Sequence, residues 1–155
     1  MRLQSAYTDT SVFGGVFDDE FTVESRAFFN LVRQGKLGLL VSDISRKENA
    51  LAPPSVRRLF DEMLPFLQVV LVDEEVLRLR DAYVAAGIVS EKWADDAGHV
   101  AAATIGGADL IVSWNFKHIA HFDKIRQYNA ISVMNGYRGI DIRSPAEVTE
   151  YENEE

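Results

Sequence analysis

Short apolar runs of strand length alternate along this chain with longer segments whose apolar residues recur at helical spacing. The runs predict five strands, at the start of residues 5–13 and near residues 37–45, 67–72, 108–115 and 139–144. The intervening segments predict helices, near residues 25–36, 46–52, 55–64, 73–87, 90–107 and 117–136. Because strands and helices alternate, we expect a single α/β domain with a parallel sheet covered on both faces.

Residues that begin and end helices sharpen these boundaries. Gly35 and Gly87 stand where helices are expected to stop, since glycine readily ends a helix. Ser55 is expected to cap the next helix, and Pro65 to end it. Asp73 lies at the amino-terminal end of the following helix, where a negative charge is favourable.

The chain's 155 residues have the usual size of one domain, and no repeat or linker divides them. We expect the domain to cover residues 1–147, followed by an acidic tail at 148–155. The absence of cysteine excludes disulfides, thiolate zinc sites and a cysteine nucleophile, and favours the cytoplasm. We expect no membrane segment, because no signal-peptide pattern and no apolar run of about 20 residues is present.

The formal net charge of −8 argues against tight nonspecific binding to nucleic acid, which usually requires a basic face. Part of this charge lies in the acidic tail. The carboxyl-terminal third is locally basic, so its cations are candidate phosphate contacts, although solvated helix faces explain each of them as well. These residues are Lys117, Lys124, Arg126, Arg138 and Arg143.

Oxygen-bearing side chains recur where predicted strands end or the following helices begin. Asp9 follows the first strand, Glu48 is expected at the start of the helix after the second, and Asn115 ends the fourth. Asp96 enters the small-residue helix on the same face as buried Val100. Each residue has another interpretation: Asp9 and Asn115 also suit turns or caps, and Glu48 also suits a solvated position.

Taken together, these four side chains predict a metal-binding pocket, because ligands of open α/β sheets bind beyond the carboxyl ends of the strands. Without a cysteine or histidine cluster, the oxygen donors suit Mg²⁺ or Mn²⁺ rather than zinc. Two such ions can activate water and stabilise the leaving oxygen during displacement at a phosphodiester. Asp43 is a reserve ligand if Glu48 points away.

Four segments give the chain a resemblance to the PIN-domain family and its VapC-type, toxin-like ribonucleases: YTDTSVF, VSDISRKE, DDAGHVAAA and ADLIVSWNFKHI. Their order and spacing cover nearly the whole chain. By motif, Asp9, Glu48 and Asp96 match the family's first three acids, and Asn115 falls at the fourth, where many members carry Asp. Ser11 and Ser113 match the polar residues that accompany these acids in the family.

The resemblance implies a three-layer α/β/α sandwich with a central parallel sheet. It also implies a Mg²⁺- or Mn²⁺-dependent endoribonuclease that hydrolyses RNA, commonly the toxin half of a toxin–antitoxin pair and often a homodimer. A PIN-like interaction module without nuclease activity is the alternative, supported by the acidic surface and by Asn115. A metal-dependent phosphatase is a third interpretation, although no phosphate-binding glycine loop is present.

Several aromatic and histidine residues lie beside the predicted site in sequence. Trp93 and Trp114 flank it and either could stack on a base, but core packing is the stronger interpretation for Trp93. A structural role is favoured for His99, three residues after Asp96. His118 and His121 are expected on the helix near residues 117–136 as surface or packing residues, with no ligand role.

Overall fold

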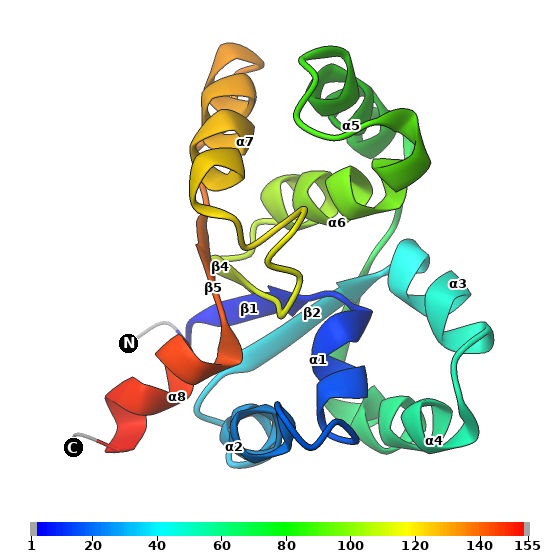
Figure 1. Ribbon diagram of the computed structural model, residues 1–155, viewed down its shortest axis with the longest axis vertical. Helices are drawn as coiled ribbons and strands as arrows, with labels where there is room; N and C mark the ends of the chain where they lie inside the picture. The colour runs from blue at the N-terminus through cyan, green and yellow to red at the C-terminus, as the bar shows by residue number, and fades with distance from the viewer. Residues whose placement is uncertain (1–2, 154–155) are drawn as a thin grey trace.

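A five-stranded parallel sheet forms the centre of the molecule (Figure 1). Its strand order is β3-β2-β1-β4-β5. The structure is a computed structural model that describes residues 3–153. The strands are β1 (Ser5–Thr8), β2 (Gly38–Ser42), β3 (Leu67–Val70), β4 (Leu110–Val112) and β5 (Asp141–Arg143). All five runs predicted from the sequence form strands, which confirms the α/β fold.

Helices cover both faces of this sheet. They are α1 (Thr10–Gly15), α2 (Thr22–Arg33), α3 (Asp43–Ala50), α4 (Pro54–Met63), α5 (Glu74–Ala85), α6 (Ala94–Ile105), α7 (Phe122–Met134) and α8 (Pro145–Asn153), with 3-10 turns at Leu64–Phe66 and Glu91–Trp93. In Figure 1, α5, α6 and α7 lie on one side, and α1, α2, α4 and α8 lie on the other. Helix α3 contacts both α4 and α6 and therefore joins the two layers.

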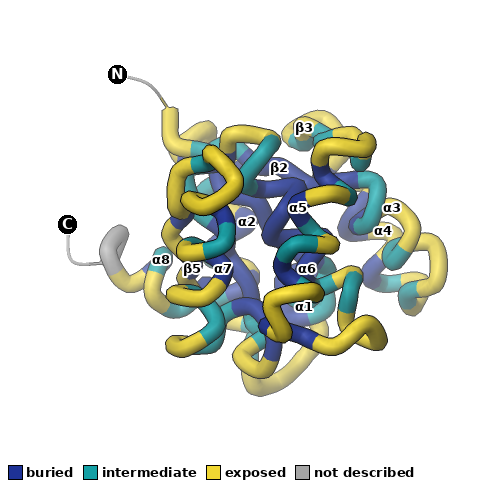
Figure 2. Tube along the Cα trace, turned by 90° about the horizontal axis from the view of Figure 1, so that it is seen from above, coloured by how far each residue is buried: buried dark blue, intermediate teal, exposed yellow. Residues whose placement is uncertain are grey.

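Two hydrophobic cores result from the alternation of side chains along each strand. Tyr7 and Ile111 pack into the core beneath α5–α7, whereas their neighbours Ala6 and Val112 pack into the core beneath α1, α2 and α4. The buried trace in Figure 2 accordingly runs through the middle of the molecule. A strand buried on both faces needs a continuous apolar run, which explains why these segments could be recognised in the sequence.

Strand β1 lies at the centre of the sheet, and its Ala6 aligns with Leu39 of β2 and Leu110 of β4. From β1 the chain continues to β2 and β3 in one direction, and β4 and β5 extend the sheet in the other. Such a reversal opens a crevice at the carboxyl ends of the strands on either side of it. The segments that begin at Asp9 and Ser113 leave the sheet at this crevice.

Several predicted boundaries are wrong for identifiable reasons. Pro53, not Ser55, is the N-cap of α4, because Pro54 occupies the first helical position. By contrast, the helix stop predicted at Pro65 is confirmed, because α4 ends at Met63 and the 3-10 turn at Leu64–Phe66 follows it. Strand β3 is a partly exposed edge strand rather than a fully buried one.

The carboxyl-terminal segment continues as helix past residue 147, the point after which the acidic tail is expected. Helix α8 extends beyond residue 147, Val148 packs against the core next to α2, and the Thr149 hydroxyl donates to the Pro145 carbonyl at 2.8 Å. Residues 154 and 155 lie outside the described part of the chain. No helix found within residues 3–153 has the length and apolar character that crossing a membrane requires.

Candidate active site

Asp9 is fixed at the sheet crevice by two serine hydroxyl groups. Ser11 Oγ donates to Asp9 Oδ1 at 2.6 Å and Ser113 Oγ donates to Asp9 Oδ2 at 3.0 Å. Each serine oxygen also accepts a backbone N–H of the β4 end, from Trp114 and Asn115 respectively. Asp9 is only 4% exposed, and burial raises the pKa of its carboxyl, because the charged form loses water contacts. The structure therefore brings Asp9, Ser11 and Ser113 together.

Glu48 lies near the end of α3, not at its start as predicted. Helix α3 begins at Asp43, because Ser42 and Ser45 form a reciprocal capping box that ends the strand early. Glu48 Oε1 lies 2.5 Å from Nε2 of His99, whose side chain is 1% exposed. Glu48 thus contacts His99, and His99 lies between Glu48 and the buried centre of the crevice.

His99 connects Glu48 to the end of β1 and β2. The Tyr7 hydroxyl donates to Ser42 Oγ at 2.7 Å and lies 2.7 Å from His99 Nδ1. Both ring nitrogens therefore lie at hydrogen-bond distance from an oxygen, Nδ1 from Tyr7 and Nε2 from Glu48. Burial disfavours the charged form of the ring, but Tyr7, Glu48 and Asp9 outweigh it and raise the pKa of His99 well above 6.5. The raised pKa favours a protonated ring at neutral pH, within the structural role expected for His99.

Asp96 and Asn115 meet on the other side of the crevice. Burial raises the pKa of the Asp96 carboxyl, while His99, His118 and a side-chain hydrogen bond from Asn115 act in the opposite direction. Asn115 Oδ1 accepts the backbone N–H of His118 at 3.0 Å, which leaves its amide nitrogen to face Asp96. Glu48 raises the pKa of Asp96 and of Asp9, so all three carboxylates share one electrostatic environment. We call Asp9, Glu48, Asp96 and Asn115 the acidic site.

The donor types of the acidic site fit a hard divalent cation. Carboxylate and carboxamide oxygens are the ligands that Mg²⁺ and Mn²⁺ prefer, and two carboxyls whose pKa values burial raises would gain from a nearby cation. The acidic site does not offer all three carboxylates to one ion, because Glu48 is directed to His99. Among the described residues, no three His, Cys, Asp or Glu side chains are positioned to hold one ion together. Asp9 and Asp96 are the carboxylates that would hold it, because the Asn115 oxygen accepts the His118 N–H and its amide nitrogen faces Asp96.

Residues expected outside the site behave differently from one another. Asp43 accepts the backbone N–H of Val72 and ties α3 to the chain after β3, so it is engaged away from Asp9. Trp93 is 38% exposed rather than packed in the core, because it belongs to the 3-10 turn before α6. His118 and His121 precede α7, which begins only at Phe122.

Tyr7 and Ser42 are site-supporting residues that the sequence interpretation missed. Both lie in strands whose apolar character drew attention to packing, yet each places a hydroxyl beside His99 or the start of α3. The sequence carries a usable signal for Ser42, a serine three residues before Ser45, which is the spacing of a capping box. For Tyr7 the only signal in the sequence is its position two residues before Asp9.

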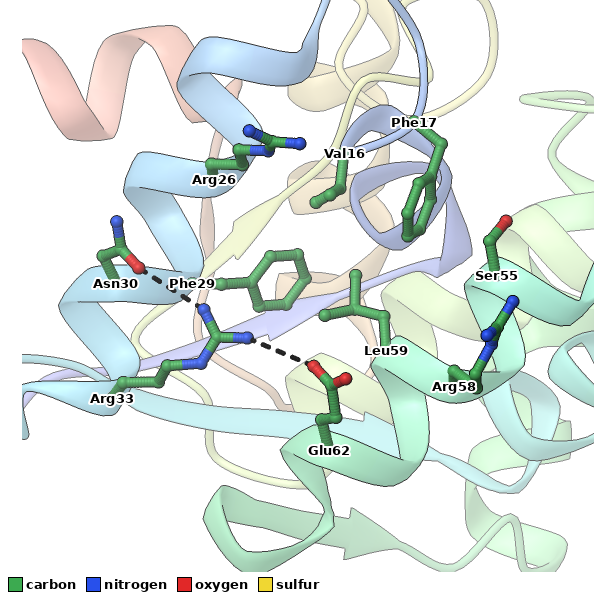
Figure 3. Close-up of a pocket in the computed structure, with 10 residues that line it drawn as sticks. All are labelled: Val16, Phe17, Arg26, Phe29, Asn30, Arg33, Ser55, Arg58, Leu59 and Glu62. Carbon is green, nitrogen blue, oxygen red and sulfur yellow. Dashed lines mark hydrogen bonds and ion pairs between the residues drawn. The ribbon is translucent and has the colours of Figure 1, made fainter.

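A separate pocket of about 410 Å³ lies between α2 and α4, where Figure 3 shows apolar side chains at its base and polar ones at its rim. Phe29 and Leu59 are buried at the base. Three arginines and one glutamate surround them, and Glu62 lies 3.9 Å from Arg33. The other two arginines of the pocket, Arg26 and Arg58, have no ion-pair partner among residues 3–153.

Solved structures share this fold. The VapBC2 structure from Rickettsia felis, bound to a DNA fragment from its promoter, superposes with a TM-score of 0.59 at 11% identity, over 91% of this chain and 98% of that chain. FitAB bound to the IR36 DNA fragment gives a TM-score of 0.56 at 15% identity, over 90% and 94%. No protein-family model and no curated protein matches the sequence. The similarity therefore shows a PIN-like fold over nearly the entire chain, with helices on both faces of a five-stranded parallel sheet.

Proposed function

We propose that this protein is a Mg²⁺- or Mn²⁺-dependent endoribonuclease of the PIN type and the toxin of a toxin–antitoxin pair. The observation that carries the proposal is a pair of carboxyls, Asp9 after β1 and Asp96 on α6, whose pKa values burial raises and on both of which His99 and Glu48 act. Asn115, which follows β4, hydrogen-bonds to Asp96. Groups with perturbed pKa values in a crevice of this kind are typical of functional sites. The fold shared with VapBC2 and FitAB supports the same assignment.

The chain's own residues would position charge at a phosphodiester. Ser11 and Ser113 hold both oxygens of Asp9, so this carboxylate keeps one orientation. Burial raises the pKa of both Asp9 and Asp96, and His99 acts against this rise and so favours their ionised forms. A bound divalent ion would supply activation of water and neutralisation of phosphate charge.

RNA cleavage with and without metal tests this proposal. We expect cleavage of a single-stranded RNA in Mg²⁺ or Mn²⁺ and none in EDTA, with a loss of at least about 100-fold in Asp9→Asn and Asp96→Asn. Asp95→Asn is the matched control, because Asp95 is the exposed neighbour of Asp96 and should retain activity. Cleavage that needs no metal, or full activity in both site variants, would refute the proposal.

The α2–α4 pocket is the surface that best suits the antitoxin partner. Its apolar base and its three arginines, in a chain of net charge −8, are complementary to an acidic segment with apolar anchors. Arg26 and Arg33 are seven residues apart, so they lie about two turns apart on α2. That length suits an amphipathic helix lying along the groove between α2 and α4.

Co-purification with the protein encoded by the neighbouring reading frame tests this surface. We expect Arg33→Glu and Arg58→Glu each to weaken the complex at least about tenfold, because each reverses a charge at the rim. Arg138→Glu is the control, since Arg138 is exposed and far along the chain from the pocket. Unchanged co-purification of both rim variants would exclude the pocket as the partner surface.

An interaction module without nuclease activity is the second candidate. The pairing of Glu48 with His99 and the neutral Asn115 favour it, because both reduce the negative charge available to a metal. It would be preferred if the purified protein bound its partner but cleaved no RNA across a series of divalent metals. Association into homodimers remains an expectation from the resemblance, and sedimentation equilibrium would test it.

A further inference from the structure

An aromatic and basic surface lies directly beside Asp96 and Asn115, and the proposed function has not used it. It consists of Trp93, Lys92, Lys117 and His118, which we call the Trp93 rim. The Trp93 and His118 rings are stacked, with centroids 4.6 Å apart and an interplanar angle of 28°. The Lys92 and Lys117 Nζ atoms lie 5.2 Å and 5.8 Å from the Trp93 ring centroid.

The rim is held firmly against the acidic site. His118 donates its backbone N–H to Asn115 Oδ1, and its carbonyl accepts the Tyr128 hydroxyl at 2.8 Å. Trp93 precedes Asp96 by three residues, at the start of α6. A molecule resting on Trp93 would therefore lie next to the carboxylate and the carboxamide of the acidic site.

His118 forms the buried side of the Trp93 rim. Its side chain is 8% exposed, yet neither Nδ1 nor Nε2 has a hydrogen-bond partner within the described residues. Buried polar atoms normally have such a partner, so an unpaired ring beside an exposed tryptophan needs an explanation.

We infer that the Trp93 rim binds a nucleotide of single-stranded nucleic acid, with the base stacked on Trp93 and the flanking phosphates on Lys92 and Lys117. This inference rests on the proposed function, because it names the form of substrate that the same site receives. An unpaired base can stack on an aromatic ring irrespective of sequence, whereas a duplex keeps its bases inside. A stacking base would replace the lysine ammonium groups over the indole and leave them to contact phosphate.

The surrounding charge makes stacking more important than attraction. Glu91 and Asp95 are exposed beside the two rim lysines, so the rim is not strongly basic. With two lysines in contact with phosphate, the logarithm of the binding constant should fall with the logarithm of salt concentration with a slope of about −1.4. A slope several times steeper would require a different, basic surface and would contradict the inference.

Fluorescence anisotropy with a labelled 12-nucleotide single-stranded RNA, in EDTA, tests the inference without cleavage. We expect Trp93→Ala to weaken binding by about 5- to 150-fold, the contribution of stacking one base on an aromatic ring. Trp93→Phe should retain most of the affinity because it keeps an aromatic face. Phe122→Ala is the matched control, since Phe122 is 75% exposed on the following helix and lies outside the rim. A hairpin duplex should bind more weakly than the single strand.

Two readouts separate this inference from the proposed function. Binding that depends on Trp93, in a protein that cleaves nothing in Mg²⁺ or Mn²⁺, would support the rim and refute the nuclease. Cleavage by the unaltered protein, together with unchanged binding by Trp93→Ala, would refute the rim and leave the nuclease standing. Absence of any binding by the unaltered protein would also overturn the inference. Circular dichroism of both Trp93 variants checks that each is folded.

Discussion

Glu48→Gln is the most informative single substitution, because it removes the charge that faces buried His99 and keeps the shape of the side chain. A hydrogen bond to a charged group contributes about 1.5–3 kcal/mol to stability. The Glu48 side chain is 33% exposed, so solvent screening places the expected loss in the lower half of that range, at about 1.5–2 kcal/mol. For a chain of 155 residues this corresponds to a melting temperature lower by about 3–8 °C.

The effect should depend on pH with a definite sign. The folded protein raises the pKa of His99, so it holds this proton more tightly than the unfolded chain does. The stabilisation is complete below the unfolded pKa of about 6.5 and is lost as pH rises through the higher folded pKa. Without Glu48, less of this stabilisation remains to be lost, so Glu48→Gln should differ most from the unaltered protein near pH 6 and least in alkaline solution.

Urea unfolding, followed by circular dichroism at several pH values from 6 to 9 in EDTA, measures this difference. Glu91→Gln serves as the control, because Glu91 is an exposed glutamate outside the His99 network. NMR titration of the histidine rings gives a second readout. Parallel stability curves for the two proteins, or a His99 ring that titrates at or below pH 6.5, would refute the reasoning.

Three further substitutions test the packing and electrostatics of the crevice. Asp9→Asn should raise the free energy of unfolding by about 1 kcal/mol at pH 7 in urea titrations, because burial raises the pKa of this carboxyl and penalises its charge; the gain should vanish below about pH 4, where Asp9 is protonated in both states. Gly15→Ala would place a Cβ 2.5 Å from Ser25 Oγ and should cost about 1–3 kcal/mol in the same assay. Gly98→Ala places its Cβ 2.6 Å from the flexible Cδ1 of Ile44 and should cost less than about 1 kcal/mol, so equal losses at the two glycines would contradict the packing described.

The order of strands and helices could be predicted because both periodicities are strong in this chain. Buried strands such as β2 and β4 read as continuous apolar runs, and α5 carries both its Asp73 cap and its Gly87 stop, which has a φ of 79°. Asp9 and Asn115 could be placed for the same reason, since each follows a recognisable strand. These patterns therefore predict that the polar side chains gather at the carboxyl ends of the strands.

The contacts between those side chains could not be predicted, because they depend on where helices begin and how rings pack. Ser42 starts α3 within an apolar run that looked like continuing strand, and this early start moves Glu48 to the far end of the helix. Core packing is the stronger expectation for Trp93 from the sequence, whereas Trp93 belongs to the 3-10 turn before α6 and is 38% exposed. The position of His99 between Tyr7 and Glu48 joins three separate segments, and no local pattern reports it.

The central place of β1 has a consequence for synthesis of the chain. Asp9 and Ser113, whose side chains hydrogen-bond, are 104 residues apart in sequence, and β1 lacks one of its two neighbours until β4 pairs with it. A nascent chain on the ribosome therefore carries Asp9 for most of translation without the hydroxyl that fixes it or the carboxamide that faces Asp96. Chains that terminate before β4 never assemble the crevice, so the host meets the complete acidic site only after translation has passed Asn115.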